Sequence, residues 1–262
     1  MKLGLSVALI LLCLTTAFAQ NFKWNKNTII AHRGAFKAKN LPENSIASLK
    51  EAIRLGCYGS EFDVYQTSDG VLVINHDPHY QGMTIAETTY AELSKHPLSN
   101  GEPIPTLEAY IQTGIKQRAT KLILEIKPVS DVQKMKEVTD AVFAMVQRFK
   151  AGPWIEYISF SYDCLLRINQ LDPKAPTAYL TGNRSLEQLK ADGISGADYH
   201  YDVVKKGEWF ETAKKLGLTM NVWTVNDVQD INWLLNHPGT FITTNEPELA
   251  FQEMNKRKGN GK

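Results

Sequence analysis

Short β-rich runs alternate with helical patterns along most of the chain, and this alternation restricts the fold more than any other feature. Eight runs carry it: TIIAH (28–32), SEFDV (60–64), LILEIK (122–127), EYISF (156–160), TAYL (177–180), GADYHY (196–201), TMNVWTV (219–225) and FITT (241–244). Regular alternation of strands and helices favours a parallel sheet whose strands are joined by crossover helices. Eight such units in 262 residues predict an α/β fold, the (β/α)8 TIM barrel.

An open, doubly wound sheet is the alternative architecture. That fold usually has a glycine-rich phosphate loop after its first strand, and no such loop follows residues 28–32. The barrel requires that VLVIN (71–75) return as the second arm of a hairpin and stay outside the ring. Residues 78–103 do not fit the alternation, so we expect them to form a small inserted cap over the mouth of the barrel.

The segment EFDVYQTSDGVLVINHD (61–77) predicts that hairpin. Its Asp69-Gly70 dipeptide suits a two-residue turn, because both residues tolerate positive φ. In that register Asp63 lies opposite His76, and Glu61, Asp63 and His76 share one face because side chains alternate along strands. A three-residue loop would shift the pairing by one position and turn His76 to the other face.

Acidic side chains stand near the carboxyl ends of the second and third predicted strands, where barrels of this kind carry their chemistry. Glu61 and Asp63 belong to the second strand and Glu125 to the third. Three carboxylates offer only oxygen ligands, which suit one hard divalent cation, Mg²⁺ or Ca²⁺. A structural ion pair between Glu125 and Lys127 is the alternative, but such buried pairs are weak evidence for stability. The set therefore predicts a metal site.

Basic and imidazole side chains are expected at the same end of the barrel. Arg33 offers a planar fork that fits two phosphate oxygens, and Lys127 adds a compact positive charge. His32 and His76 can act as general acid and general base across a phosphorus centre. These residues together predict phosphoryl chemistry.

Seven motifs, in this order, resemble those of the glycerophosphodiester phosphodiesterase family: AHRG (31–34), LPENS (41–45), EFDVYQTSDG (61–70), VINHD (73–77), PTLE (105–108), LEIK (124–127) and VWTVND (222–227). The resemblance extends from about Ile29 to Glu248. It implies a metal-dependent enzyme that hydrolyses small glycerophosphodiesters to sn-glycerol 3-phosphate and an alcohol. It also implies His32 and His76 as the catalytic pair, with the metal on the carboxylates of the second and third strands.

Other positions of these motifs carry secondary expectations. Glu43 and Asn44 lie in the family's PEN motif, where we expect Asn44 to cap the next helix and Glu43 to orient Arg33. The indole of Trp223 either forms an apolar wall against a glycerol backbone or packs in the core. Asn245 departs from the family, which commonly has Asp there; we expect it to support the last loop without affecting catalysis.

The first residues predict export. MKLGLSVALILLCLTTAFAQ places Lys2 before an apolar run and small residues at a cleavage site after Ala19, as in a secretory signal peptide. The run is shorter than the roughly 20 residues of a membrane-spanning helix. We expect a periplasmic or secreted protein with no stable membrane insertion, in which residues 20–262 form one domain.

Composition excludes some partners. Without Lys2 the acidic and basic side chains balance, so no basic surface for nucleic acid is expected. Two cysteines remain, Cys57 and Cys164, and the barrel topology would place them near opposite ends. We therefore expect two unpaired thiols.

Three other functions compete with the phosphodiesterase. A phospholipase (C- or lyso-D-type) that acts on lipid phosphodiesters needs exposed apolar loops, and residues 78–103 are polar. A glycoside hydrolase needs a pair of carboxylates, and the strand ends at 160 and 225 lack one. A catalytically silent phosphodiester-binding barrel has no need for both histidines together with the three carboxylates.

Overall fold

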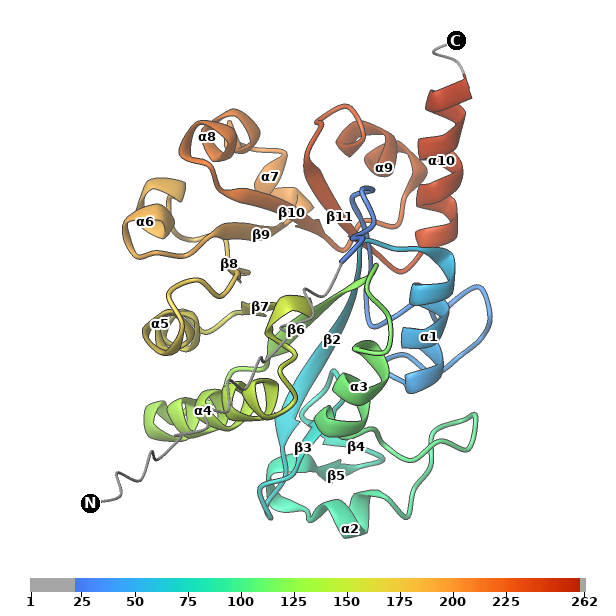
Figure 1. Cartoon of the computed structure of the whole chain (residues 1–262), viewed down its shortest axis with the longest axis vertical. Helices are drawn as coiled ribbons and strands as arrows, with labels where there is room; N and C mark the ends of the chain where they lie inside the picture. Colours follow the sequence, from blue (N-terminus) through green and yellow to red (C-terminus); the bar gives the residue numbers. More distant parts are fainter. Residues whose placement is uncertain (1–21, 260–262) are drawn as a thin grey trace, which may run out of the picture.

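Eight parallel strands form a closed ring in the computed structural model, which describes residues 22–259 (Figure 1). The ring follows chain order, and β1 pairs with both β2 and β11, which closes it. This confirms the (β/α)8 barrel and excludes the doubly wound sheet. The predicted signal peptide lies outside the described residues. The strands are β1 (Ile29–Ala31), β2 (Gly59–Gln66), β6 (Lys121–Ile126), β7 (Ile155–Ser159), β8 (Thr177–Tyr179), β9 (Gly196–His200), β10 (Thr219–Trp223) and β11 (Thr240–Thr244).

Helices cover the outside of the ring (Figure 1). In α4, buried Val138, Val142 and Val146 recur every four residues and so line one face. Asp131 begins this helix, because its carboxylate accepts a hydrogen bond from Lys134 N. The helices are α1 (Ile46–Leu55), α3 (Leu107–Gly114), α4 (Val132–Arg148), α5 (Tyr162–Leu171), α6 (Leu186–Ala191), α7 (Tyr201–Val204), α8 (Trp209–Leu216), α9 (Val228–Leu234) and α10 (Pro247–Gly259).

Strand alternation separates two kinds of buried side chain. On β6, Leu122 and Leu124 face outward and pack against the helices, while Ile123 faces the barrel interior. Each such aliphatic side chain, once buried, contributes roughly 1.5–3 kcal/mol. Farther along the same inward row stand Glu125 and Lys127, which are also buried. The interior is thus apolar in its middle and charged toward the carboxyl ends of the first strands.

The hairpin register differs from the two-residue turn that Asp69-Gly70 suggested. Strand β3 (Leu72–Ile74) pairs with β2 so that Val64, not Tyr65, lies opposite Ile74. The loop therefore has three residues, 68–70, and its third, Gly70, adopts a left-handed φ of 83°. Contacts from the insertion hold this loop, because the Asp69 carboxylate accepts a hydrogen bond from Tyr90 N. A three-residue hairpin loop also commonly has glycine at its last position. Asp69-Gly70 alone is therefore compatible with both a two-residue and a three-residue loop.

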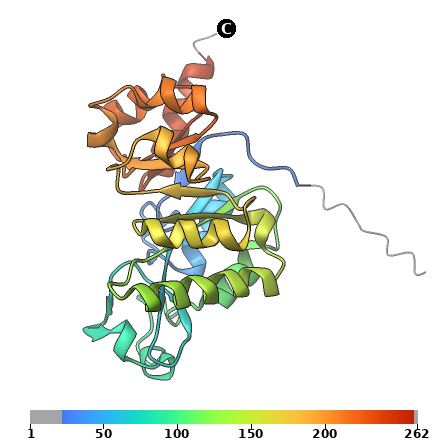
Figure 2. The same cartoon turned by 90° about the vertical axis from the view of Figure 1, so that its left-hand side faces the viewer.

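The insertion after the hairpin has its own small apolar core. It contains β4 (His79–Tyr80), β5 (Met83–Thr84), a 3₁₀ turn (Ile85–Glu87) and α2 (Tyr90–Leu93). It lies on one side of the molecule, and the N-terminal segment from Phe22 leaves on the opposite side (Figure 2). Among the described residues, none from 78–103 lines the central pocket. The insertion therefore extends the rim beside β2 and does not form the pocket wall.

Both cysteines are buried and unpaired, as expected. Among the helices that the structure describes, none combines the length and the apolar character needed to span a bilayer.

Candidate active site

A strained turn at the end of β1 begins the site. Arg33 and Gly34 adopt left-handed φ values of 55° and 78°. A side chain at Gly34 would place its Cβ 2.4 Å from Ser48 Oγ, so only glycine fits there. The turn aims the backbone N–H of Arg33 at Glu61 Oε2, 2.8 Å away. The AHRG motif thus fixes the first strand to a carboxylate of the second.

Three carboxylates converge from the middle of β2 and from the carboxyl end of β6. Parallel pairing sets Asp63 opposite Glu125, and Glu61 lies two residues before Asp63 on the same face. One ligand oxygen from each of the three lies within 4.8 Å of the others. All three residues are at most 6% exposed. The structure therefore brings the predicted metal-ligand set together.

Lys127 lies directly against this cluster. Its Nζ is 3.0 Å from Asp63 Oδ1 and 2.9 Å from Glu125 Oε1. The side chain lines the pocket, as expected for a phosphate contact. In addition, its ammonium forms ion pairs with two of the three carboxylates. One ammonium against three carboxylates leaves an excess of negative charge when all three are ionised.

Burial and mutual repulsion set the protonation of these acids. Burial, together with the charges of Asp63 and Glu125, raises the pKa of Glu61 well above its ordinary value. Burial and Asp63 raise the pKa of Glu125 to about 8. Burial alone would also raise the pKa of Asp63, but Lys127 and the Asn44 amide hold it below its ordinary value.

The cluster fits a divalent cation. Glu61 Oε1 is buried and has no hydrogen-bond partner among the described residues. A buried, unpartnered carboxylate oxygen is costly unless a ligand satisfies it. The donors are oxygen atoms only, which suits Mg²⁺ or Ca²⁺ and disfavours zinc.

Glu43 and Asn44 support the two charged strands. Arg33 Nη1 donates to both carboxylate oxygens of Glu43, at 2.9 and 3.0 Å, as expected for an orienting partner. The expectation that Asn44 caps α1 is wrong, because Ser45 is the capping residue. Asn44 takes a left-handed φ of 56° and its amide donates to Asp63 Oδ2 at 2.8 Å. It therefore holds a carboxylate of the cluster.

Both predicted histidines line the pocket. His32 Nδ1 lies 2.7 Å from Asn245 Oδ1, and its Nε2 lies 3.9 Å from Glu61 Oε2. Burial, followed by the nearby charge of Arg33, lowers the pKa of His32 to about 4. Asn245, which we expected to support the last loop, also contacts an imidazole of the site.

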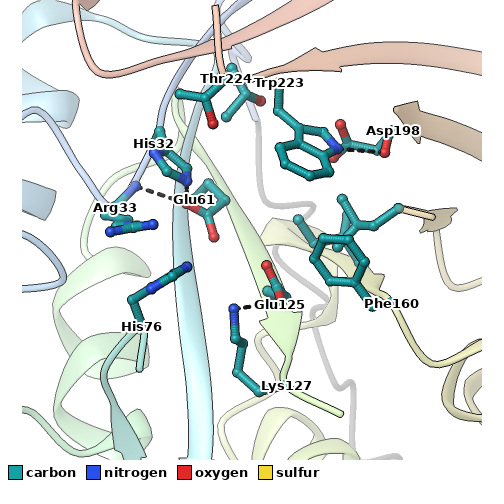
Figure 3. Close-up of a pocket in the computed structure, with 13 residues that line it drawn as sticks. His32, Arg33, Glu61, His76, Glu125, Lys127, Phe160, Asp198, Trp223 and Thr224 are labelled. Atoms are coloured by element: carbon teal, nitrogen blue, oxygen red, sulfur yellow. Dashed lines mark hydrogen bonds and ion pairs between the residues drawn. The ribbon is translucent and has the colours of Figure 1, made fainter. Parts of the chain in front are cut away.

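His76 reaches the pocket in spite of the shifted hairpin register. Strand β3 ends at Ile74, and Asn75 N donates to Asp63 O at 3.1 Å, in the position expected for His76. Beyond the strand, alternation no longer decides where a side chain points. His76 lies beside Asp77, with Nδ1 2.7 Å from Asp77 Oδ1, and turns toward the pocket (Figure 3).

The opposite wall is mostly apolar. Phe160 and Trp223 meet edge to face, with ring centroids 5.5 Å apart, and both line the pocket (Figure 3). Trp223 is thus both a wall residue and a packed one. Asp198 also lines this wall, and the sequence did not indicate it because a single acid in GADYHY does not stand out. Thr224 and Thr243 are further lining residues that the sequence did not indicate.

Carboxylates, imidazoles and an arginine at the carboxyl end of a (β/α)8 barrel define a hydrolase-type site for phosphate esters. The sequence matches the profile of the glycerophosphoryl diester phosphodiesterase family over residues 32–249. The chain belongs to that family and is an enzyme of the phosphodiesterase class.

Individual relatives agree with this assignment. The chain is 26% identical to a glycerophosphodiester phosphodiesterase of Caldanaerobacter subterraneus, over 88% of this chain and 99% of the relative. A glycerophosphodiester phosphodiesterase from Parabacteroides distasonis, whose crystal structure is known, shares 39% sequence identity with the chain. The two structures superpose with a TM-score of 0.86, over 90% of this chain and 100% of the Parabacteroides chain. A phosphodiesterase of Oleispira antarctica, solved with its product sn-glycerol-3-phosphate, is 25% identical with a TM-score of 0.76, over 87% of this chain and 97% of that one.

Proposed function

We propose that this protein hydrolyses small glycerophosphodiesters to sn-glycerol 3-phosphate and an alcohol. The observation that carries the proposal is the convergence of three buried carboxylates, two histidines and Arg33 on one pocket. The Oleispira relative holds this product in its structure.

Glu61, Asp63 and Glu125 would hold one divalent cation, Mg²⁺ or Ca²⁺. Bound there, the cation supplies positive charge to the phosphoryl oxygens. Arg33 and Lys127 add fixed positive charge beside the same position. Arg33 Nε is buried without a hydrogen-bond partner among the described residues, so it can donate to a phosphate oxygen.

His32 and His76 divide the proton transfers between them. His32 is neutral at physiological pH, because burial lowers its pKa to about 4, so it can accept a proton from the nucleophile. Its Nδ1 is held by Asn245, which leaves Nε2 free to act. His76 is more exposed, at the pocket entrance, where it can protonate the departing alkoxide. We assign His32 as base and His76 as acid on this difference in environment.

The test is release of glycerol 3-phosphate from glycerophosphocholine, glycerophosphoethanolamine and glycerophosphoinositol, with Mg²⁺ and Ca²⁺ in turn. We expect metal-dependent turnover that a chelator abolishes and readdition restores. Preference for lysophosphatidylcholine would instead favour a phospholipase. Binding of glycerophosphodiesters without turnover under every metal would favour a silent binding barrel. Proton flow is tested separately, by the pH profiles of the histidine variants.

We also propose that the protein is exported and that residues 20–262 form its mature, single-domain chain. The support is the amino-terminal sequence, with Lys2, an apolar run and small residues at 17 and 19. Mass spectrometry of the native protein should give a chain that begins at Gln20. An intact Met1 in the native protein would exclude cleavage.

A further inference from the structure

The pocket has a charged half and an apolar half. The charged half comes from β1, β2, β6 and the hairpin, while Ile158, Phe160, Leu180 and Trp223 line the other side. In the closed ring, β9 lies four strands from β2 in either direction and is therefore opposite it. Figure 3 shows the same division, with the histidines and Arg33 facing Phe160 and Trp223 across the pocket.

Asp198 is the acid of the apolar half. It stands on β9 between Ala197 and Tyr199, which face the outer core, so its own side chain faces the interior. The residue is 2% exposed, and its Oδ1 has no hydrogen-bond partner among the described residues. A buried acceptor without a partner is unfavourable unless a ligand satisfies it.

The Asn221 amide lies near the Asp198 carboxylate, but the close side-chain hydrogen bonds of Asn221 are made to Thr243. Asn221, its partner on β10, donates to Thr243 Oγ1 at 2.9 Å and accepts a bond from the same hydroxyl. Trp223 Nε1 donates to the backbone carbonyl of Asp198 at 2.8 Å, which holds the indole beside the carboxylate. In the described part of the chain, Asp198 forms no ion pair. Asn221 and Glu156 both act electrostatically on the Asp198 carboxyl group, but neither gives its Oδ1 a hydrogen bond.

We propose that Asp198 is a specificity residue that accepts a hydrogen bond from a free hydroxyl on the substrate's alcohol in the apolar half. This rests on the proposed function and deepens it, because it names the residue that would distinguish a substrate with this hydroxyl from one without it. An apolar wall of Phe160, Leu180 and Trp223 suits a carbon skeleton but would leave its hydroxyl unpaired. Asp198 supplies the missing acceptor, and a carboxyl oxygen accepts in either protonation state.

The test compares kcat/KM for glycerophosphocholine with two analogues in which glycerol is replaced by 1,2-propanediol or 1,3-propanediol. Each analogue lacks one hydroxyl. A substrate that leaves Asp198 unpaired should lose roughly 10- to 100-fold in the wild type. The ratio of kcat/KM for glycerophosphocholine to kcat/KM for that analogue should fall to about threefold or less in D198V. D198N keeps an acceptor oxygen and should retain most of the wild-type ratio.

E156Q is the matched control. Glu156 is also a carboxylate inside the barrel, but it accepts from Tyr58 Oη at 2.6 Å and does not line this pocket. Its replacement should leave the ratio at the wild-type value. Glycerophosphoglycerol forms a second arm, because its leaving alcohol also carries hydroxyls. A D198V penalty confined to that substrate would place the recognised hydroxyl on the leaving group.

Two failures are distinguishable. If D198V lowers all rates equally and keeps the wild-type ratio, Asp198 is structural and the inference is overturned. If the wild type hydrolyses none of the diesters, the proposed function fails. Calorimetry then still decides the inference, because it measures the Kd of glycerol 3-phosphate and the Kd of 1,2-propanediol phosphate. Wild type should prefer glycerol 3-phosphate, and D198V must lose that preference. Unchanged metal affinity in D198V excludes an indirect effect through the carboxylate cluster.

Discussion

His32 Nδ1 lies 2.7 Å from Asn245 Oδ1, at the seam where β1 and β11 close the barrel. Because an amide oxygen only accepts, the ring hydrogen sits on Nδ1 and the lone pair sits on Nε2. The backbone N–H of Asn245 in turn donates to Asn226 Oδ1 at 2.9 Å, which holds the loop that carries the Asn245 side chain. Asn245 is thus a positioning residue for the proposed base.

Replacement of Asn245 by Asp should shift the acidic limb of the kcat/KM profile to higher pH. A carboxylate stabilises the imidazolium and raises the pKa of His32 from about 4, and a protonated base is inactive. N245A should lower kcat about 10- to 100-fold with a smaller change in KM. N100D, at an exposed loop of the insertion, is the control and should behave as wild type. An unmoved acidic limb in N245D would contradict this role.

Removal of either pocket imidazole should reduce turnover without unfolding the protein. H32Q and H76Q should each lose about 10²- to 10⁴-fold in kcat, the usual range for a general acid or base. In H32Q the acidic limb of the kcat/KM profile should disappear, because His32 is the group with the lowered pKa. H79Q, at an exposed position in the insertion, serves as control. Near-normal kcat in both pocket variants, with metal restored, would reject the acid–base assignment.

The carboxylate cluster predicts opposite effects of E61Q with and without metal. In the apo protein at pH 8, E61Q should be more stable than wild type, because a raised folded-state pKa makes the ionised acid destabilising above its ordinary pKa. Added Ca²⁺ or Mg²⁺ at 100 times Kd should stabilise wild type by about 2.7 kcal/mol. E61Q should show little of that gain. Thermal unfolding with chelator and with metal measures both effects, and equal metal shifts in the two proteins would remove Glu61 from the ligand set.

Asp198 should make stability fall as pH rises. Burial raises its pKa from 3.8 to about 7 in the folded protein, so the native state binds the extra proton between these values. Relative to D198N, wild type should lose up to about 4 kcal/mol in unfolding free energy between pH 4 and pH 8. Denaturant titrations of metal-free protein at both pH values measure this difference, with exposed D202N as control. If the difference in unfolding free energy between wild type and D198N is the same at both pH values, the pKa of Asp198 is not raised in the folded protein.

The strands were predictable because most of their residues are buried, so that most strands read as short, mainly apolar runs. The charges that interrupt two of these runs, Glu61 and Asp63 on β2 and Glu125 and Lys127 on β6, marked the site for the same reason. Such residues are costly in a barrel interior unless a partner or a ligand satisfies them.

Other parts depended on geometry that a linear pattern does not contain. Asp69-Gly70 fits two hairpin loops, and contacts from the insertion decided between them. Asn245 meets His32 only because the barrel closes between β1 and β11. Asp198 is a single acid on a strand, and its significance lies in the absence of a partner among the described residues.

The two halves of the pocket are encoded in different stretches of the chain. The proposed reactive groups come mainly from residues before 128, and the wall that faces them comes from residues after 157. Exchange of the segment from β7 to β10 between homologues would therefore alter which alcohols are accepted, while the proposed reactive groups and Asn245 stay unchanged. Such chimaeras offer a route to new selectivity in this barrel.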